Sequence, residues 1–395
     1  MNNKISWIKR DLIGFSLTSL FNDLSHEMTT SLLPIFVEGM VGPAAPLALG
    51  VIMGCADAIA TVMKLVSGML VNYVRSFKPI LLIGYALTPL CVGLIGMTHH
   101  IWQILVLQSI AWMGRGLREP MRDVWITNIA APADYGKTFG LQRAFDTIGA
   151  ILGPSLAFFL IGRLSLRSSF FIAFIPGLFS VLSLLLLTSN YIRQVVATEY
   201  RNWRSQLTSL PAPFKRFLIV MFIFGIGNFH KSLLIYQAHA VFLGQGSSNV
   251  IATGFAIGLY ILFNCMRACA EFSIGFLSDY VSRTKLLAWF GFGLFAIVNV
   301  GLISATSNLL WWLIIFITGG ISIGTVTSLE KSHAAQLLPA PVQGIGFGLL
   351  QSVDGIGDLL SSVVVGAIWT YISPEIAFMY AVTLSIIAMV LLLRK

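Results

Sequence analysis

The chain has 395 residues, of which 56% are hydrophobic and only 10% are charged. An ordinary soluble domain carries about 25% charged residues, so this composition excludes a soluble globular protein and indicates an integral membrane protein. The formal net charge of +9 is expected for a membrane protein with basic cytoplasmic loops, and it does not require a nucleic-acid partner.

Long apolar runs, such as Ile80–Met97 and Phe170–Thr188, predict membrane-spanning helices, because β-barrel strands would show about ten residues of alternating polarity. The runs define about twelve helices, each with the ~20 residues that a bilayer core requires. The fold class is therefore an all-α membrane protein. We place the helices at residues 12–38, 46–72, 79–98, 101–130, 137–163, 168–189, 214–242, 248–278, 284–305, 308–337, 341–371 and 374–394.

Lysine and arginine residues gather on one side when the predicted helices alternate across the bilayer. They precede the first helix, follow the second and eighth, and fill the polar loop at 190–213. The positive-inside rule then places both termini and this loop in the cytoplasm of a cell with a bacterial-type inner membrane, with Arg163 and Arg167 as exceptions. The loop separates two six-helix bundles, at 1–189 and 214–395.

The two halves repeat each other. Gly136–Gly149 aligns without a gap with Gly344–Gly357, and Gly68–Val74 aligns with Gly275–Val281. Both copies have the same predicted membrane orientation, so the axis that relates the halves runs along the membrane normal.

Two short motifs follow the second and eighth predicted helices. They consist of Gly68, Asn72 and Arg75 in the first half and Gly275, Asp279 and Arg283 in the second. With these motifs and its two repeated halves, the chain resembles the major facilitator superfamily of secondary transporters. The resemblance implies two six-helix bundles related by a pseudo-twofold axis, and a cytoplasmic gate at these motifs. Asn72 stands where the family usually has aspartate.

Charged side chains inside membrane helices are costly, so they are candidates for function. Arg115 and Arg118 lie on one face of the predicted fourth helix, and guanidinium groups bind carboxylate or phosphate with two hydrogen bonds. Lys231 and Arg267 are the counterparts of Arg115 in the second half, and Gln237 is a further candidate there. We expect these five residues to bind the substrate. Alternatively, the two arginines neutralise buried acids of the first bundle.

Four acidic residues of the first half are candidates for proton coupling: Asp23, Glu27, Asp57 and Asp146. Asp23 and Glu27 lie one turn apart on the same helix face, which disfavours joint ionisation and makes proton sharing easier. We expect these two to exchange protons, with Asp57 and Asp146 as second candidates. Asp146 recurs as Asp354 in the repeat, which favours a structural role for that position.

A further set of charged residues has partners of opposite sign at the equivalent positions of the other half. Equivalent positions approach each other in a pseudo-twofold arrangement, so these residues could form ion pairs between the halves. We expect them to act as gate residues together with the two glycine motifs. The pairs are Lys64 with Glu271, Arg122 with Glu330, and Asp123 with Lys331.

The motifs do not indicate an enzyme. No serine, histidine or aspartate falls in a nucleophile turn, and the phosphate-binding pattern GxxxxGK[ST] does not occur, so coupling to an ion gradient is favoured over ATP. We therefore predict a proton-coupled secondary active transporter that moves a small polar or anionic organic solute by alternating access. A carboxylate-rich metal chelate or siderophore is one such solute.

We expect no cofactor, and we expect the proton gradient to be the source of energy. The expected partners are a small-molecule substrate and the lipid bilayer, with no nucleic acid, and the expected state is a monomer. The main alternative function is a multidrug or cation efflux proton antiporter, in which the buried acids bind the substrate and the arginines only neutralise them. A metal-ion carrier that uses Asp23 and a non-transporting membrane receptor of the same fold are two further alternatives.

Overall fold

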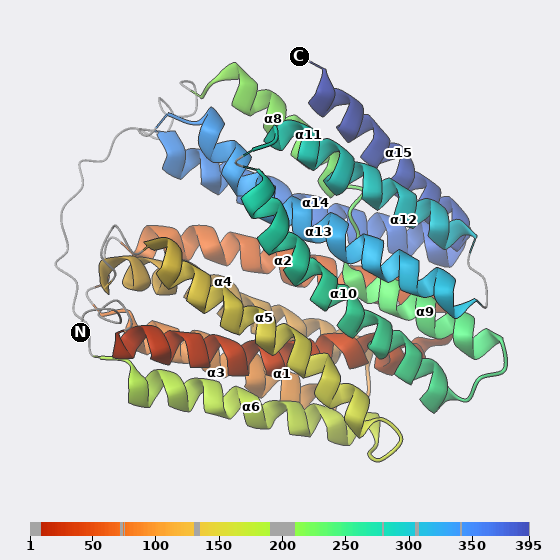
Figure 1. The fold of residues 1–395 in the computed structure, drawn as a ribbon. Helices are drawn as coiled ribbons and strands as arrows, with labels where there is room; N and C mark the ends of the chain where they lie inside the picture. The colour runs from red at the N-terminus through yellow and green to blue at the C-terminus, as the bar shows by residue number, and fades with distance from the viewer. Residues whose placement is uncertain are drawn as a thin grey trace, which may run out of the picture. The chain divides into compact units, whose positions relative to one another are not determined.

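A computed structural model describes residues 9–71, 74, 76–129, 135–189, 210–278, 280–304, 308–339 and 342–394. The elements of these residues are helices, as predicted (Figure 1). Those before the central loop are α1 (Arg10–Val41), the short η1 (Gly42–Ala44), α2 (Ala45–Leu70), α3 (Lys78–Ile95), α4 (Ile101–Ile129), α5 (Tyr135–Leu160) and α6 (Leu166–Leu187). Those after the loop are α8 (Ala212–Gly225), α9 (Lys231–Gly244), α10 (Asn249–Leu277), α11 (Arg283–Leu286), the π-helical η3 (Leu287–Gly293), α12 (Leu294–Ile303), α13 (Leu309–Leu337), α14 (Gln343–Tyr371) and α15 (Pro374–Leu393).

The prediction of one continuous helix at 214–242 is wrong, because the chain breaks between α8 and α9. Side chains of α14 satisfy backbone groups that the break exposes. Ser361 Oγ donates to the carbonyl of Asn228 at 2.9 Å, and the amide of His230 donates to Ser362 Oγ at 3.3 Å. A break inside a membrane helix is tolerated when a neighbouring helix supplies such partners.

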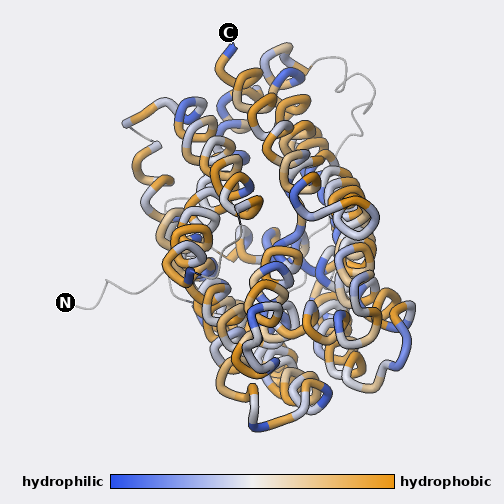
Figure 2. The backbone as a smooth tube through the Cα atoms, turned by 90° about the vertical axis from the view of Figure 1, so that its right-hand side faces the viewer, coloured by the Kyte–Doolittle hydropathy of each residue, from blue (hydrophilic) through white to orange (hydrophobic). Residues whose placement is uncertain are grey.

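Among the described residues, nine helical segments are long and apolar enough to cross a membrane. One of them, Arg10–Leu70, contains both α1 and α2. The charged α4 and the broken pair α8 and α9 are not among the nine, although they occupy predicted spans. Figure 2 shows hydrophobic residues along most of the helical length. Large apolar side chains such as Phe159, Phe272 and Phe276 are exposed on the helices, as expected for a surface that lipid covers.

The chain forms two compact units. The first comprises Met1–Leu33 and Ile59–Thr198, and the second comprises Pro34–Ala58 and Glu199–Lys395. The segment Pro34–Ala58, the α1–α2 hairpin, groups with the C-terminal helices. Pro34 lies inside α1, where proline removes a backbone hydrogen bond and bends a helix.

In the first unit, α3 packs against α4 and α6. Gly84 and Gly114 allow the backbones of α3 and α4 to touch, because a Cβ atom on Gly84 would lie 2.8 Å from the carbonyl oxygen of Gly114. Small residues allow this kind of close helix packing in membranes. The contact fixes the register of α4 against α3 and thereby positions the charged face of α4.

In the second unit, α10 packs along α13. Cβ atoms on Gly320 and Gly324 of α13 would each lie 2.5 Å from a carbonyl oxygen of α10. The stretch Gly320–Gly324 has the spacing GxSxG, which hydrolases use in a nucleophile turn. Here it lies within a helix, so its glycines serve helix packing.

Candidate functional site

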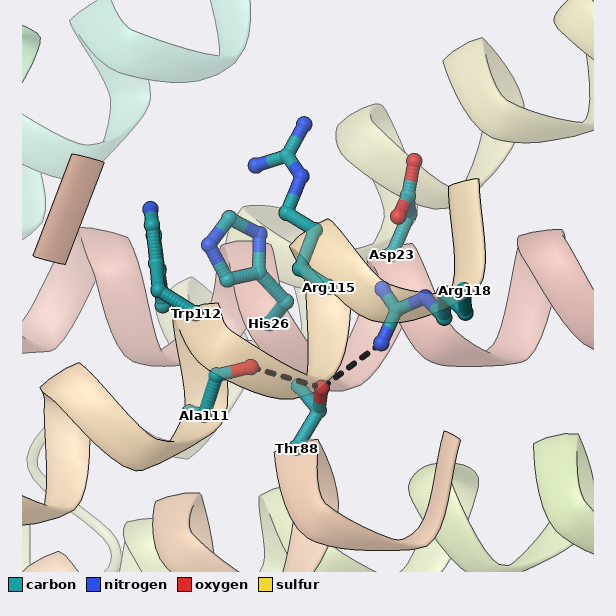
Figure 3. A pocket seen from close by; sticks show the side chains of 7 residues that line it. All are labelled: Asp23, His26, Thr88, Ala111, Trp112, Arg115 and Arg118. Carbon is teal, nitrogen blue, oxygen red and sulfur yellow. Dashed lines mark hydrogen bonds between the residues drawn. The ribbon is translucent and has the colours of Figure 1, made fainter. Parts of the chain in front are cut away.

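A pocket in the first unit is lined by residues of three helices (Figure 3). Asp23 and His26 come from α1, Thr88 comes from α3, and Ala111, Trp112, Arg115 and Arg118 come from α4. Residues three or four positions apart lie on the same face of a helix, which explains how α1 and α4 each contribute several side chains. The pocket brings together three predicted site residues, namely Asp23, Arg115 and Arg118.

Arg118 is fixed by α3. Its side chain is buried, and Nη1 donates to Thr88 Oγ1 at 2.7 Å and to the carbonyl oxygen of Gly84 at 3.2 Å. Its guanidinium carbon lies 4.5 Å from the centre of the Tyr85 ring, a distance typical of a cation–π contact. These contacts with neutral groups orient the cation before any ligand binds.

Arg115 is part of an ion-pair triad. Its Nε lies 2.8 Å from Glu119 Oε1, and Lys64 Nζ lies 2.8 Å from Glu119 Oε2. One carboxylate therefore serves two cations, so the triad retains an excess positive charge. The side chain of Arg115 is 41% exposed, which leaves it the more accessible of the two pocket arginines.

Asp23 is the carboxylate among these cations. The charged groups that act on it are Asp146, Arg115, Glu27 and Arg118. Asp23 also accepts a long hydrogen bond of 3.5 Å from the amide of Asn22. Its charge is thus balanced by the pocket arginines and opposed by two other acids, which is the environment of a group that can exchange a proton.

Glu27 is buried next to His26. The His26 Nδ1 atom lies 3.7 Å from Glu27 Oε1, and the imidazole ring lies 4.5 Å from the ring of Trp112. Thr30 Oγ1 lies 3.4 Å from the other ring nitrogen of His26. His26 therefore connects the buried Glu27 to the aromatic wall of the pocket.

Thr88 and Ala111 of this site were not in the predicted set, nor were three charged, titratable or aromatic residues of α1 and α4: His26, Trp112 and Glu119. The spacing along the helix places each of these last three residues on the same face as a predicted site residue. His26 lies three positions after Asp23, Trp112 three positions before Arg115, and Glu119 four positions after Arg115. The second partner of Glu119, Lys64 on α2, has no such signal in the sequence.

Asp146 belongs to a polar network that joins α1, α4 and α5. Gln142 donates to both carboxylate oxygens of Asp146, at 3.0 and 2.8 Å, and also to Ser19 Oγ at 3.1 Å. Arg122 Nη1 donates to the same Ser19 hydroxyl at 3.3 Å. Asp146 is therefore bound to scaffold residues of the first unit. Asp57, the remaining predicted acid, lies in the α1–α2 hairpin and belongs to the second unit.

The predicted substrate residues of the second half lie on α9 and α10. Lys231 begins α9, and its Nζ atom lies 5.3 Å from the centre of the Tyr260 ring. Arg267 Nε lies 3.0 Å from Glu271 Oε1, and Gln237 is buried on α9. That these three residues act together with Arg115 and Arg118 remains a prediction.

Several predicted gate residues form contacts within their own half. Lys64 pairs with Glu119, Glu271 pairs with Arg267, and Arg122 lies 3.0 Å from its neighbour Asp123. The predicted ion pairs between the halves, which also involve Glu330 and Lys331 of α13, remain a prediction.

The structure describes three of the six residues of the two glycine motifs: Gly68, Gly275 and Arg283. Arg283 Nη1 donates to the carbonyl oxygen of Ser332 in α13 at 3.0 Å, which ties the second motif to a neighbouring helix. A Cβ atom on Gly275 would lie 3.3 Å from Ser328 Oγ, whereas one on Gly68 would meet nothing within 4 Å. The other three motif residues, Asn72, Arg75 and Asp279, lie outside the described residues.

Comparison with known proteins identifies the family. The family model of the Major Facilitator Superfamily matches residues 15–270. The chain is 30% identical over 387 residues to MJ1317, an uncharacterised MFS-type transporter of Methanocaldococcus jannaschii, covering 97% of this chain and 93% of that protein. It is 23% identical to the class E tetracycline resistance protein of Escherichia coli, over 72% of this chain and 70% of that one. The crystal structure of a mutant of the nucleoside transporter NupG aligns with a TM-score of 0.80 at 14% identity, covering 96% of this chain and 99% of that one.

The fold and these matches define a multi-pass integral membrane transporter of small molecules, which is not an enzyme. The chain belongs to the Major Facilitator Superfamily.

Proposed function

We propose that this transporter is coupled to protons and moves a small anionic or polar organic solute by alternating access. The proposal rests on the pocket of the first unit, whose lining residues include two arginines and one acidic residue, Asp23. Arg118 and Arg115 would bind the solute, and Asp23 and Glu27 would exchange protons. The proton gradient would be the energy source, in a bacterial-type inner membrane with both termini in the cytoplasm.

The pocket offers a direct coupling between proton and solute. Protonation of Asp23 removes one of the negative charges that act on Arg115 and Arg118, so the affinity of the pocket for an anion rises. By thermodynamic linkage, a bound anion favours the protonated form of Asp23 by the same factor. Anion and proton would therefore occupy the pocket together. A carboxylate-rich chelate of a metal, such as a siderophore, is one solute that two guanidinium groups suit.

The replacement of Arg115 with lysine tests the binding assignment. Lysine keeps the charge but loses the planar group that binds a carboxylate with two hydrogen bonds. In proteoliposomes that carry the Arg115→Lys variant, we expect the proton-driven uptake of an organic anion to fall at least about tenfold. A tenfold fall in affinity corresponds to about 1.4 kcal/mol of binding free energy. The matched control is Arg163→Lys, since Arg163 is exposed and lies outside the pocket. Unchanged anion uptake and competition in Arg115→Lys would contradict the assignment.

A multidrug or cation efflux antiporter is the second candidate. The similarity to a tetracycline resistance protein favours it, as does the buried Glu27 near the rings of His26 and Trp112, which could bind a cation by charge and by its aromatic faces. Competition assays separate the two candidates. Lipophilic cations would inhibit transport by an efflux antiporter. Organic anions would instead inhibit transport by the proposed anion carrier.

A further inference from the structure

The α1–α2 hairpin, Pro34–Ala58, packs on α14 with direct backbone contact. A Cβ atom on Gly50 of α2 would lie 2.0 Å from the carbonyl oxygen of Ser362, and one on Gly366 of α14 would lie 2.5 Å from that of Pro46. The amide of Leu47 donates to Thr370 Oγ1 at 3.1 Å. Each of these contacts lies within the second unit. The hairpin is therefore a segment of the first two helices that is bound by the C-terminal helices.

An ion pair joins the same hairpin to α9. Glu38 Oε2 lies 2.8 Å from His239 Nδ1, and the histidine side chain is only 2% exposed. The other ring nitrogen, Nε2, lies 3.1 Å from Asn249 Oδ1 of α10, an oxygen that also accepts a hydrogen bond from Thr253 Oγ1. Nδ1 thus lies at ion-pair distance from a carboxylate oxygen, in a geometry that is not a hydrogen bond, and Nε2 lies at hydrogen-bond distance from an amide oxygen. A protonated ring carries the positive charge that the ion pair with Glu38 needs, whereas a neutral ring does not.

The surroundings of His239 define which groups control its charge. Within the described part of the chain, Glu38 faces it from α1, and the neutral Asn249 faces it from α10. Tyr236, almost one turn earlier on α9, interacts electrostatically with Glu38 and packs edge-on against Trp369 of α14 at 5.6 Å. A charge on His239 would therefore be balanced by the carboxylate of Glu38.

We propose that His239 and Glu38 form a second proton-binding site, distinct from Asp23 and Glu27, that holds the hairpin on α9 while His239 is protonated. In the proposed alternating-access cycle, the hairpin would leave the C-terminal helices in one of the states. Loss of the proton from His239 leaves the Glu38 carboxylate facing a nitrogen that has become an acceptor or lacks its charge, which weakens the docking. The proposal rests on the proposed proton coupling, and it adds a proton-dependent contact at the end of α1 opposite the N-terminus.

The experiment measures the docking itself, without substrate or a proton gradient. Nitroxide labels are placed on Gly39→Cys, where a Cβ meets nothing within 4 Å, and on the exposed Glu375→Cys at the start of α15. The background has its four native cysteines replaced by serine, namely Cys55, Cys91, Cys265 and Cys269. The distances between the two labels are recorded by double electron–electron resonance in lipid nanodiscs, at about pH 6 and about pH 9. These two values lie on either side of the pH range in which histidine side chains ordinarily titrate.

We expect the population with the hairpin docked to fall at least about threefold between these two pH values. His239→Gln and Glu38→Gln should each give the high-pH distribution at both pH values. His333→Gln, which changes a histidine of α13 away from the hairpin, is the matched control and should keep the pH response. Gly50→Leu, which clashes with the backbone of α14, provides the reference distribution of an undocked hairpin.

A docked population that does not respond to pH, or a His239→Gln variant that keeps the full response, would overturn the proposal. The charge-swapped double variant Glu38→His with His239→Glu addresses misfolding of the single variants, because it should restore docking and its pH dependence. Failure of the proposed anion transport would leave these distances unchanged, so the two proposals can fail independently.

Discussion

Arg118 shows how a single residue is kept charged inside an apolar helix bundle. Its Nη1 group donates to the hydroxyl of Thr88 and the carbonyl oxygen of Gly84, and the guanidinium group lies over the ring of Tyr85. These partners are neutral, so they compensate for part of the lost hydration without cancelling the charge. The free-energy cost of burying the cation is thereby reduced, and its charge remains available to Asp23 or to an anion.

Helical spacing predicted part of this site. Arg115 and Arg118, three positions apart, share a face, and Asp23 lies on the pocket side of α1. Which helices meet at the pocket depends on tertiary packing, which spacing along one helix does not specify. For this reason the bridge from Glu119 to Lys64 on α2 was not predicted.

Glu119→Gln tests the triad at the residue scale. The neutral amide leaves Lys64 and Arg115 without their shared carboxylate, and we expect the free energy of unfolding to fall by about 1 kcal/mol, since both pairs are partly exposed. The released Arg115 should also bind organic anions more tightly. Thermal unfolding in detergent and anion binding to the purified protein measure the two effects. Glu375→Gln, a change at an exposed carboxylate, should alter neither. Weaker anion binding in Glu119→Gln would show that Arg115 depends on Glu119 for its position.

At the scale of elements, the apolar runs located most helices to within a few residues. They did not reveal the break between α8 and α9, because Gly225 and Gly227 stand in an otherwise apolar run and glycine is common in membrane helices. The break is stabilised by Ser361 and Ser362 of α14, which are far away in sequence. The helix pattern is thus encoded locally, whereas its interruption depends on a distant partner.

Gly84→Ala tests the packing of α3 on α4. The added methyl group would lie 2.8 Å from the carbonyl oxygen of Gly114 and 3.0 Å from the Cβ atom of Arg118. We expect the variant to lose about 1–3 kcal/mol of stability through overpacking. Gly140→Ala in α5 meets nothing within 4 Å, so the higher helix propensity of alanine should stabilise that variant by up to about 1 kcal/mol. Thermal unfolding of both variants measures the contrast, and a stabilised Gly84→Ala would contradict the packing argument.

At the scale of the whole molecule, the internal repeat predicted two halves divided at residues 190–213, whereas the boundaries of the compact units also lie within α1 and α2. The α1–α2 hairpin belongs to the first half by sequence but groups with the C-terminal helices, through Gly50 and Gly366 among others. A repeat shows which segments are related by duplication, and it does not show which segments bind each other in a given state. A segment that belongs to one half by sequence and to the other by packing is where we look for movement.

Pro34 marks the point in α1 where the first unit ends and the second begins. Pro34→Ala restores the backbone hydrogen bond that proline removes, so α1 becomes stiffer and the helix more stable. If the hairpin moves about this point during transport, the variant should carry solute several times more slowly while its binding affinity stays the same. Pro176→Ala in α6 is the matched control, since this proline also lies inside a helix but within a single unit. It should raise the unfolding temperature without slowing transport. Initial uptake rates and equilibrium binding in the same preparations separate these effects, and a normal transport rate in Pro34→Ala would rule out a hinge at this position.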